Sequence, residues 1–327
     1  SAPPVVITNN TATIDQTGNR NFGQVAQSFG FSGDESTNNV AAITQNGNDN
    51  GAFVGHGFGA DDNDVDLSQT GNRNRADAFQ DEGATGNEAD VVQTGNDNTA
   101  LVEQRGVGTD DNASDILQEG NRNGAGTFQV GVGNDAQIQQ RGNDNFSLFT
   151  QTGDDNRAIE RMTAGNDNEV FVDQSGNGNN AIYEIWGNGN DVDIDQVGND
   201  NDIFFNARGT GSGLPSPPGG GVNRNVVDFN QTGDGNLLSG ALDGSRNEIT
   251  TTQSGNDNFI GTSLFSFDGM FVVGNANLID VLQDANSNSA FVDVDGNTNM
   301  VDVNQLTDGN TANAMAMGNG NSSTINQ

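Results

Sequence analysis

The sequence has no cysteine and no lysine, only five prolines, and aromatic residues at 6% of its 327 positions. Without cysteine, disulfides cannot stabilise the fold, and cysteine usage gives no hint of the redox compartment. No apolar stretch approaches eighteen residues, so the sequence predicts no transmembrane helix. The chain starts at Ser1 instead of Met, which fits a mature product whose signal peptide has been removed.

Positively charged residues are also scarce. Eleven arginines face 45 acidic residues, for a net charge of −34. A nucleic-acid or anionic-lipid partner needs a basic patch, and the sequence offers none. Hydrophobic residues make up 31% of the chain and glycine occurs 46 times, a composition that by itself would predict disorder.

A short repeat overrides that expectation. Between Gln93 and Gln104 the chain makes a step of eleven residues, which begins with the turn Gly95-Asn96-Asp97-Asn98. The quartet Gly-Asn-x-Asn occurs fourteen times along the chain. Disordered chains have no reason to keep such a spacing over three hundred residues, so the repeat indicates a repetitive fold.

Each repeat contains a strand pattern. Counting back from Gln93 in twos gives Val91, Ala89 and Asn87, while the residues between are mostly polar or acidic. Alternation over six residues, bounded by a Gly-Asn turn, predicts a half-buried β-strand. One face of the strand carries Asn, a small residue, an aliphatic residue and Gln, and the other face meets water.

Two strands and two turns take about 22 residues and cannot bury their apolar face alone, so the units must stack. We therefore predict an all-β fold, a two-sheet parallel β-solenoid of about thirteen strand-turn-strand rungs, amyloid-like in character, over residues 10–327. Residues 1–9 form an extended arm, and the Gly/Pro-rich stretch 209–222 is a loop insertion. All five prolines lie outside the predicted strands, as a proline cannot donate to a ladder.

Buried amides need partners, and identical amides on successive rungs can satisfy one another. We predict amide ladders in the core at Gln16, Gln45, Gln69, Gln93, Gln104, Gln118, Gln129, Gln140, Gln151, Gln174, Gln196, Gln231, Gln253, Gln283, Gln305, Asn87, Asn98 and Asn112. The second sheet also takes Gln27, Gly55, Gln80 and Gln327 at these positions. Sharp turns need residues that tolerate positive φ, a role we assign to the motif Asn and to Gly18, Gly71, Gly95, Gly120, Gly142, Gly176, Gly198 and Gly255.

The repeat resembles the curlin repeat of the major subunit of curli, the amyloid fibres of bacterial biofilms. Asn87, Gln93, Gly95, Asn98, Ala100 and Gln104 stand at its consensus positions in order. The resemblance implies a secreted, extracellular, cell-surface fibre protein, exported through an outer-membrane pore, nucleated by a minor homologue and polymerised end to end. The sequence departs from the repeat where Gln is replaced, at Ile185, Ala207, Leu242, Val294 and Ala316.

The register continues to Gln327 and begins by Asn10, so neither end shows a cap. Exposed strand edges template pairing, and we predict head-to-tail homopolymers through a polymerisation edge at Ile14, Gln16, Ile325 and Gln327. Because outward aspartates stacked at strand spacing repel one another, acid or divalent cations are expected to speed assembly.

Other functions find less support. The turns lack the nine-residue Gly-Gly-x-Gly-x-Asp repeat of calcium β-rolls, and Arg20, Arg73 and Arg122 alternate with aspartates there, so we expect no specific metal. His56 has no second histidine or cysteine to work with. We expect no enzyme activity and no cofactor. The alternative is a monomeric secreted β-solenoid, either an adhesin or an ice-binding or Ca²⁺-binding rod. Tyr183 and Trp186 flank Ile185, and we expect them to cover the sheet instead of stacking on a sugar.

Overall fold

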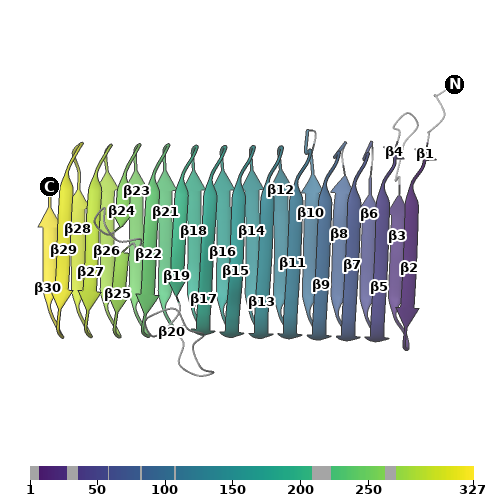
Figure 1. Ribbon diagram of the computed structural model, residues 1–327, viewed down its shortest axis with the longest axis horizontal. Coiled ribbons are helices and arrows are strands. Elements are labelled where there is room, and N and C mark those ends of the chain that lie inside the picture. The colour runs from purple at the N-terminus through teal and green to yellow at the C-terminus, as the bar shows by residue number, and fades with distance from the viewer. Residues whose placement is uncertain are drawn as a thin grey trace. The chain divides into compact units, whose positions relative to one another are not determined.

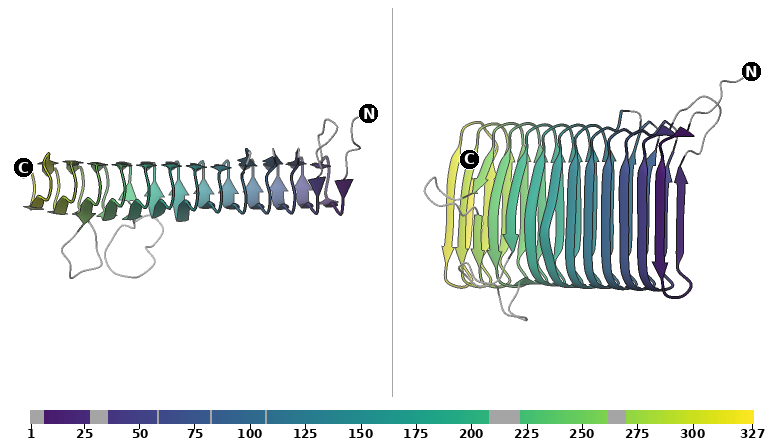
Figure 2. Two further views of the ribbon diagram at one scale, coloured as in Figure 1. Left: turned by 90° about the horizontal axis from the view of Figure 1, so that it is seen from above. Right: turned by 45° about the vertical axis from the view of Figure 1, so that its right-hand side comes forward.

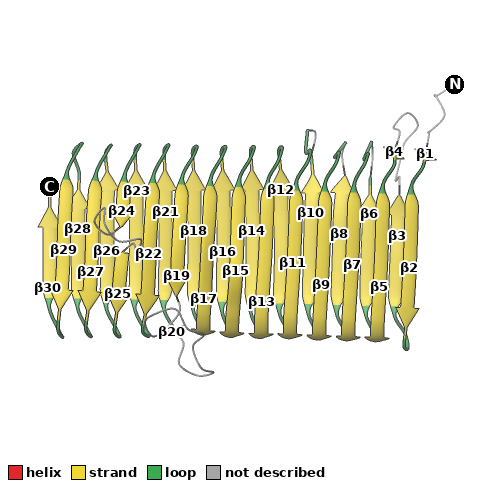
Figure 3. Ribbon diagram, viewed as in Figure 1, coloured by secondary structure: helices red, strands yellow, loops and turns green. Residues whose placement is uncertain are grey.

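The computed structural model describes residues 7–27, 36–57, 59–81, 83–106, 108–207, 222–261 and 270–327. These residues form strands and turns without a helix (Figures 1 and 3). None of them could therefore build a membrane-crossing helix. The chain divides into two compact units, residues 1–157 and 158–327, which we describe separately.

Unit 1 contains six rungs, and every pairing between its strands is parallel. In each rung, one strand belongs to sheet 1, a Gly-Asn-x-Asn turn follows, and the next strand belongs to sheet 2. Sheet 1 consists of β2 (Thr11–Thr17), β5 (Val40–Asn48), β7 (Asp64–Asn72), β9 (Glu88–Asn96), β11 (Ala113–Asn121) and β13 (Asp135–Asn143). Sheet 2 consists of β3 (Phe22–Gln27), β6 (Gly51–His56), β8 (Arg75–Asp81), β10 (Thr99–Arg105), β12 (Gly124–Val130) and β14 (Phe146–Thr152).

Unit 2 repeats this plan with seven rungs. Its sheet 1 contains β15 (Arg157–Asn166), β17 (Asn180–Asn188), β19 (Asp202–Ala207), β22 (Leu237–Asp243), β24 (Phe259–Gly261) with β25 (Met270–Val273), β27 (Ser289–Asp295) and β29 (Thr311–Met317). Its sheet 2 contains β16 (Glu169–Ser175), β18 (Asp191–Val197), β21 (Val226–Thr232), β23 (Glu248–Ser254), β26 (Leu278–Asp284), β28 (Met300–Gln305) and β30 (Ser322–Asn326).

The remaining features are short strands. β1 (Ile7–Thr8) pairs with β4 (Ser36–Thr37), so part of the predicted arm at residues 1–9 forms a strand, while residues 1–6 lie outside the described chain. β20 (Val222–Asn223) pairs with β17 and holds the last residue of the predicted insertion; residues 209–221 lie outside the described chain. β24 and β25 share one rung, with β22 on one side and β27 on the other.

The strands form because their side chains alternate between a dry layer and water. In β9, Ala89, Val91 and Gln93 are buried while Asp90 and Val92 are exposed. The two sheets of each unit face each other as two layers (Figure 2), with the buried positions of both between them. Sheets about 10 Å apart bury one face of every strand. The predicted fold class, a two-sheet parallel β-solenoid, is confirmed.

Candidate functional site: amide ladders and strand edges

Glutamine amides form continuous hydrogen-bonded ladders through the core. In sheet 1 of unit 1, Gln45 Nε2 donates to Gln69 Oε1 at 2.8 Å and Gln69 Nε2 to Gln93 Oε1 at 2.9 Å. The same bond, at 2.6–3.0 Å, connects the rest of this ladder, Gln16 to Gln45 and Gln93 to Gln118 to Gln140. A shorter ladder in sheet 2 runs through Gln80, Gln104, Gln129 and Gln151 at 2.8–2.9 Å. Each amide inside a ladder both donates and accepts, which satisfies its polar atoms.

Among the described residues of unit 2, one such ladder is present, in sheet 2. It runs through Gln174, Gln196, Gln231, Gln253, Gln283, Gln305 and Gln327, with Nε2–Oε1 distances of 2.8–3.1 Å. Sheet 1 of this unit has aliphatic or small side chains in register instead, among them Ile185, Ala207 and Leu242. In both units each of these glutamine–glutamine bonds donates toward the C-terminal end, so each ladder has a donor end and an acceptor end.

Buried asparagines form ladders that run the opposite way. Asn112 Nδ2 donates back to Asn87 Oδ1 at 2.9 Å, and Asn98 Nδ2 donates back to Asn74 Oδ1 at 3.1 Å. The second Nδ2 hydrogen of Asn98 reaches the carbonyl oxygen of Gly120 at 2.9 Å, which fixes the turn of the next rung. Opposed amide directions let the dipoles of neighbouring ladders partly cancel.

The turn glycines are required by the stacking as well as by φ. Gly95 has a φ of +123°, and a Cβ there would lie 1.8 Å from the carbonyl oxygen of Gly120 on the next rung. Gly18, Gly71, Gly120, Gly176 and Gly198 meet the next glycine in the same way, and Gly255 meets Ala285. Positive φ falls on the glycine and on the x residue of Gly-Asn-x-Asn, for example +59° at Asp97. We had assigned positive φ to the motif asparagines, and this was wrong, because these residues build side-chain ladders instead.

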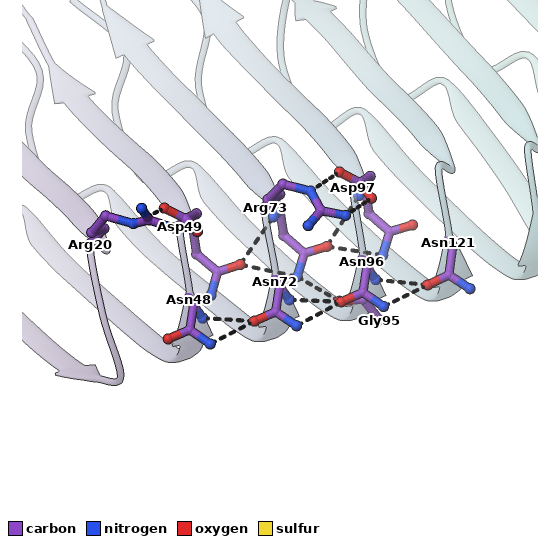
Figure 4. A network of polar contacts seen from close by, with 12 residues as sticks. Arg20, Asn48, Asp49, Asn72, Arg73, Gly95, Asn96, Asp97 and Asn121 are labelled. Carbon is purple, nitrogen blue, oxygen red and sulfur yellow. Dashed lines mark hydrogen bonds and ion pairs between the residues drawn. The ribbon is translucent and has the colours of Figure 1, made fainter.

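A further ladder lies along the outside of the turns in unit 1 (Figure 4). The first Asn of each motif donates to the next one, with Asn48, Asn72, Asn96 and Asn121 in line at 2.9–3.0 Å. Beside it the x residues alternate between arginine and aspartate and form ion pairs, Arg20–Asp49, Arg73–Asp97 and Arg122–Asp144, at 2.5–2.6 Å. The hydrogen bond from Arg73 lowers the pKa of the Asp97 carboxyl.

His56 interrupts the ladder of sheet 2. It lies in register between Gln27 and Gln80, a position that we had assigned to Gly55. Gly55 instead aligns with Phe79, on the outward side. An eleven-residue step from Gln45 leads to His56, so the repeat spacing already indicated His56 as the ladder position.

The His56 ring is fully buried, and within the described chain neither of its nitrogens makes a hydrogen bond of regular geometry. Burial lowers the pKa of His56 to about 4, although the neighbouring Gln80 acts to raise it. Gln80 Oε1 likewise receives no hydrogen bond from a described residue. This rung therefore lacks the bonds that the others make.

Carboxylates stack on the outer face of sheet 1 in unit 1. Asp66, Asp90 and Asp115 are direct register partners on β7, β9 and β11. Partial burial, together with the charges of Asp115, Glu88, Asp66 and Asp64, raises the pKa of Asp90 to about 6. No group of three or more His, Asp or Glu side chains in the described part of the chain is arranged to hold a metal ion.

The expectation that Tyr183 covers the outside of the sheet is wrong. Its ring is 1% exposed and points into the core, where its hydroxyl donates to Glu160 Oε2 at 3.0 Å. Burial and the nearby Glu160 carboxylate raise the Tyr183 pKa. Trp186 Nε1 donates to Glu184 Oε1 at 2.5 Å. Glu160 is not among the residues predicted from the sequence, although it lies two residues after the inward Ala158 and alternation therefore places it on the same face.

The predicted edge residues lie on the terminal rungs. Ile14 and Gln16 are in β2, which pairs only with β5 among the described strands, and Ile14 is 44% exposed. Ile325 is in β30, which pairs only with β28 among the described strands, and Gln327 follows it directly. The first pair of residues belongs to sheet 1 and the second pair to sheet 2.

Comparison with known proteins gives a family. Residues 60–95, 84–106, 131–159, 165–198 and 274–306 match the curlin associated repeat. No curated protein matches the chain. Among solved structures, the polySia-specific acetyltransferase NeuO is 11% identical over 86% of this chain and 82% of its own, with a TM-score of 0.16. A similarity at that level bears on neither fold nor function.

Curlin proteins are structural and non-enzymatic, and family membership suggests a secreted, extracellular protein. The repeats and the β-solenoid together fit a curli-like structural subunit. The five matched stretches show that the chain contains curlin associated repeats, which supports its assignment to the curlin family.

Proposed function

We propose that the chain is a structural subunit of an extracellular, curli-like amyloid fibre and that it polymerises end to end by stacking its terminal rungs. One observation carries the proposal. Gln327 Nε2 ends a ladder with a single hydrogen bond, to the Thr311 carbonyl at 3.2 Å, whereas Gln305 Nε2 bonds both a carbonyl and the next amide. Gln27 Oε1, at the other end of the chain, accepts no bond from a described residue. The spare donor and the spare acceptor are complementary.

Backbone groups at the two edges are complementary as well. Met300 N donates to Asn321 O and Gln327 N to Asn304 O, so the odd-numbered residues near β30 bond inward to β28. Because alternate residues of a parallel ladder bond opposite neighbours, Ser322, Thr324 and Asn326 turn their N–H and C=O groups to the open edge. By the same alternation, the Phe22 N–H bonds β6 and Gly23, Val25 and Gln27 face the open edge of β3.

In-register stacking of two copies would set β30 on β3 and β29 on β2. Gln327 then meets Gln27 of the next copy and Ile325 meets Val25, so sheet 2 continues both its amide ladder and its apolar column. In sheet 1, Ala316 meets Gln16 and Ala314 meets Ile14, which continues the backbone ladder without an amide pair. We therefore assign the specific bond of the interface to sheet 2.

The wider role follows from this assembly. We propose a part in the biofilm matrix, surface adhesion and aggregation, with no catalytic activity and no specific metal. Membership of the curlin family supports a nucleator subunit and an outer-membrane secretion pore as further partners. A net charge of −34 gives no support for binding nucleic acid.

A proline at the open edge tests the assembly. Thr324→Pro removes an N–H that faces outward, so the monomer loses no ladder bond, whereas the growing fibre loses one and meets the proline ring. Thr324→Val keeps the N–H and is the matched control. We expect fibres, by electron microscopy and thioflavin fluorescence, from the wild type and Thr324→Val only. Equal elongation of Thr324→Pro, with its folded monomer verified by circular dichroism, would refute the proposed stacking. A wild type that stays monomeric would favour a soluble adhesin.

A further inference from the structure

The two outer faces of unit 1 differ sharply in charge. On sheet 1 the outward positions carry eight acidic residues and one arginine, a net charge of −7: Asp15, Asp64, Asp66, Glu88, Asp90, Asp115, Glu119, Asp135 and Arg141. On sheet 2 they carry three acidic residues and two arginines, a net charge of −1: Asp77, Asp81, Glu103, Arg75 and Arg105. In so acidic a chain, the outer face of sheet 2 is nearly neutral.

The charges on that face are also paired within it. Arg75 contacts Asp77 at 2.6 Å, and Arg105 forms an ion pair with Glu103. A face whose cations are already neutralised has little to offer an ionic ligand. This argues for an uncharged or self-complementary partner.

Aromatic and aliphatic side chains occupy the rest of the face. Outward positions on sheet 2 hold Phe22, Phe53, Phe79, Leu101, Phe128, Val130, Phe146 and Leu148. Phe22 is 59% exposed and Phe146 39%. We call this outer side of sheet 2, from β3 to β14, the aromatic face. A contiguous apolar surface of this kind marks an interaction site in a soluble protein.

The aromatic face contains a hollow at one end. A groove of about 570 Å³ lies between Phe22, Phe53 and Phe79, with Gly51 in it and Arg75 and Asp77 at its side. A Cβ on Gly51 would meet no atom within 4 Å, whereas a Cβ on Gly124 would lie 2.9 Å from the Phe146 ring. The space beside Gly124 is filled by a neighbour, and the space beside Gly51 is open.

We propose that the aromatic face docks on the aromatic face of a second copy of this chain and joins fibres side by side. The inference rests on the proposed fibre function and adds the surface through which fibres pair. Phe22 and Gly51 are direct register partners on neighbouring strands. A two-fold axis can therefore set each Phe22 into the partner's groove, as a self-complementary interface requires. The acidic faces repel, which leaves the aromatic face as the side of approach for unit 1.

The area of the aromatic face sets the strength of the contact. Six strands spaced by about 4.8 Å, each about seven residues long, cover roughly 600 Å² per copy. Two such faces together fall at the low end of the range for specific interfaces. Single subunits are held only weakly by such a contact, while a fibre that repeats it at every subunit gains avidity. Pairing of fibres is thus expected to follow polymerisation.

Matched variants test this pairing. Phe146→Glu places a charge on the aromatic face, and Val92→Glu places the same charge at a residue of nearly equal exposure, 41%, on the outer face of sheet 1. Gly51→Phe fills the groove without adding charge. Fibre pairing is measured from widths in electron micrographs and from low-speed sedimentation. We expect at least a five-fold drop in paired fibres for Phe146→Glu and Gly51→Phe. Pairing should be unchanged in Val92→Glu, and every variant should still form thioflavin-positive fibres.

Pairing that persists in both aromatic-face variants, or that is lost equally in Val92→Glu, would overturn the inference. Wild-type fibres that remain single yet bind a neutral polysaccharide, with Phe146→Glu abolishing that binding, would overturn it in favour of a polysaccharide surface. If the wild type forms no fibres, the proposed function fails separately. The inference is then decided by sedimentation equilibrium of concentrated monomer, where a weak dimer that Phe146→Glu abolishes supports it and its absence overturns it.

Discussion

At the scale of single residues, each ladder position is selected by the rungs on either side of it. A buried glutamine is favourable here because the copies before and after it supply one donor and one acceptor. His56 shows the opposite case, since its ring cannot reproduce both amide bonds and Gln80 Oε1 loses its donor. The contribution of a core side chain to stability therefore depends more on its register partners in neighbouring rungs than on its neighbours in the same strand.

We predict that His56→Gln stabilises the protein by roughly 2 kcal/mol at pH 7, because it restores amide bonds and removes buried unsatisfied atoms. The pKa of His56 is lowered to about 4, so the unfolded state binds the extra proton between pH 6.5 and 4. Stability from this group is therefore complete above pH 6.5 and is lost as the pH falls toward 4. Urea unfolding of freshly purified monomer at pH 7 and pH 4.5 measures both effects.

The matched control is Gln104→His, which introduces the same break two rungs of sheet 2 further on, where Gln80 and Gln129 flank the site. It should cost about as much as His56→Gln gains. Unchanged stability in both variants would show that the ladder bonds contribute little.

At the scale of the strand, stacking in register brings identical side chains together whether or not they attract. In unit 1 this stacking is favourable for the alternating arginines and aspartates of the turns, because it brings them into ion pairs. The column of Asp66, Asp90 and Asp115 is destabilised by charge repulsion, because parallel in-register strands hold like charges one strand spacing apart. The same strand, β9, thus carries a repulsive carboxylate at Asp90 and is followed by a paired one at Asp97.

We predict that Asp90→Asn stabilises the monomer at pH 7 and weakens its response to acid. The Asp90 pKa is raised to about 6 by partial burial and neighbouring carboxylates, so the folded state binds the proton more tightly than the unfolded state does. That contribution is fully present below about pH 4 and is lost as the pH rises through 6. Thermal unfolding midpoints between pH 4 and pH 7.5 should therefore vary less in the variant than in the wild type.

Asp97→Asn provides the contrast, because the pKa of Asp97 is lowered by Arg73. Its contribution is present above its unfolded pKa and is lost as the pH falls, so the variant should be destabilised at pH 7 and closer to the wild type in acid. If both substitutions shift stability in the same direction at pH 7, the register-based account of the carboxylates is wrong.

The whole molecule extends the same logic from rung to rung and, in our proposal, from copy to copy. Such an interface needs no separate binding site, because the next copy stacks as a further rung. A bond from Gln327 of one copy to Gln27 of the next would continue the glutamine ladder across the interface. The proposed fibre is polar, with two different ends, because each glutamine–glutamine ladder bond donates toward the C-terminal end. The head-to-tail contact is heterologous, so nothing in it closes a ring at a fixed number of copies.

We predict that Gln327→Leu raises the soluble concentration in equilibrium with fibres by about five-fold, which corresponds to about 1 kcal/mol for one amide hydrogen bond. Gln27→Leu should do the same from the other side of the interface. Because the two residues are proposed to share one bond, the double variant should cost less than the two single variants added together. Strictly additive effects, measured by sedimentation of assembled samples, would show that the two amides do not meet.

Much of this molecule could be predicted from the sequence. Period-two alternation and the eleven-residue step predicted the strands, their two sheets and the all-β solenoid, because a repeating chain with strand-length units can bury its apolar face only by stacking. Asn87, Gln93 and Gln104 could be assigned to the core for the same reason, as amides there need identical neighbours.

Local sequence could not determine the features that depend on contacts between rungs. The assignment of Gly55 in place of His56, the inward position of Tyr183 and its bond to Glu160 were all settled by register across strands. The direction of each ladder, the carboxylate column behind the raised pKa of Asp90, and the near neutrality of the aromatic face likewise came from tertiary structure. Periodicity specifies which side chains point inward, but only the stacked strands determine which atoms meet.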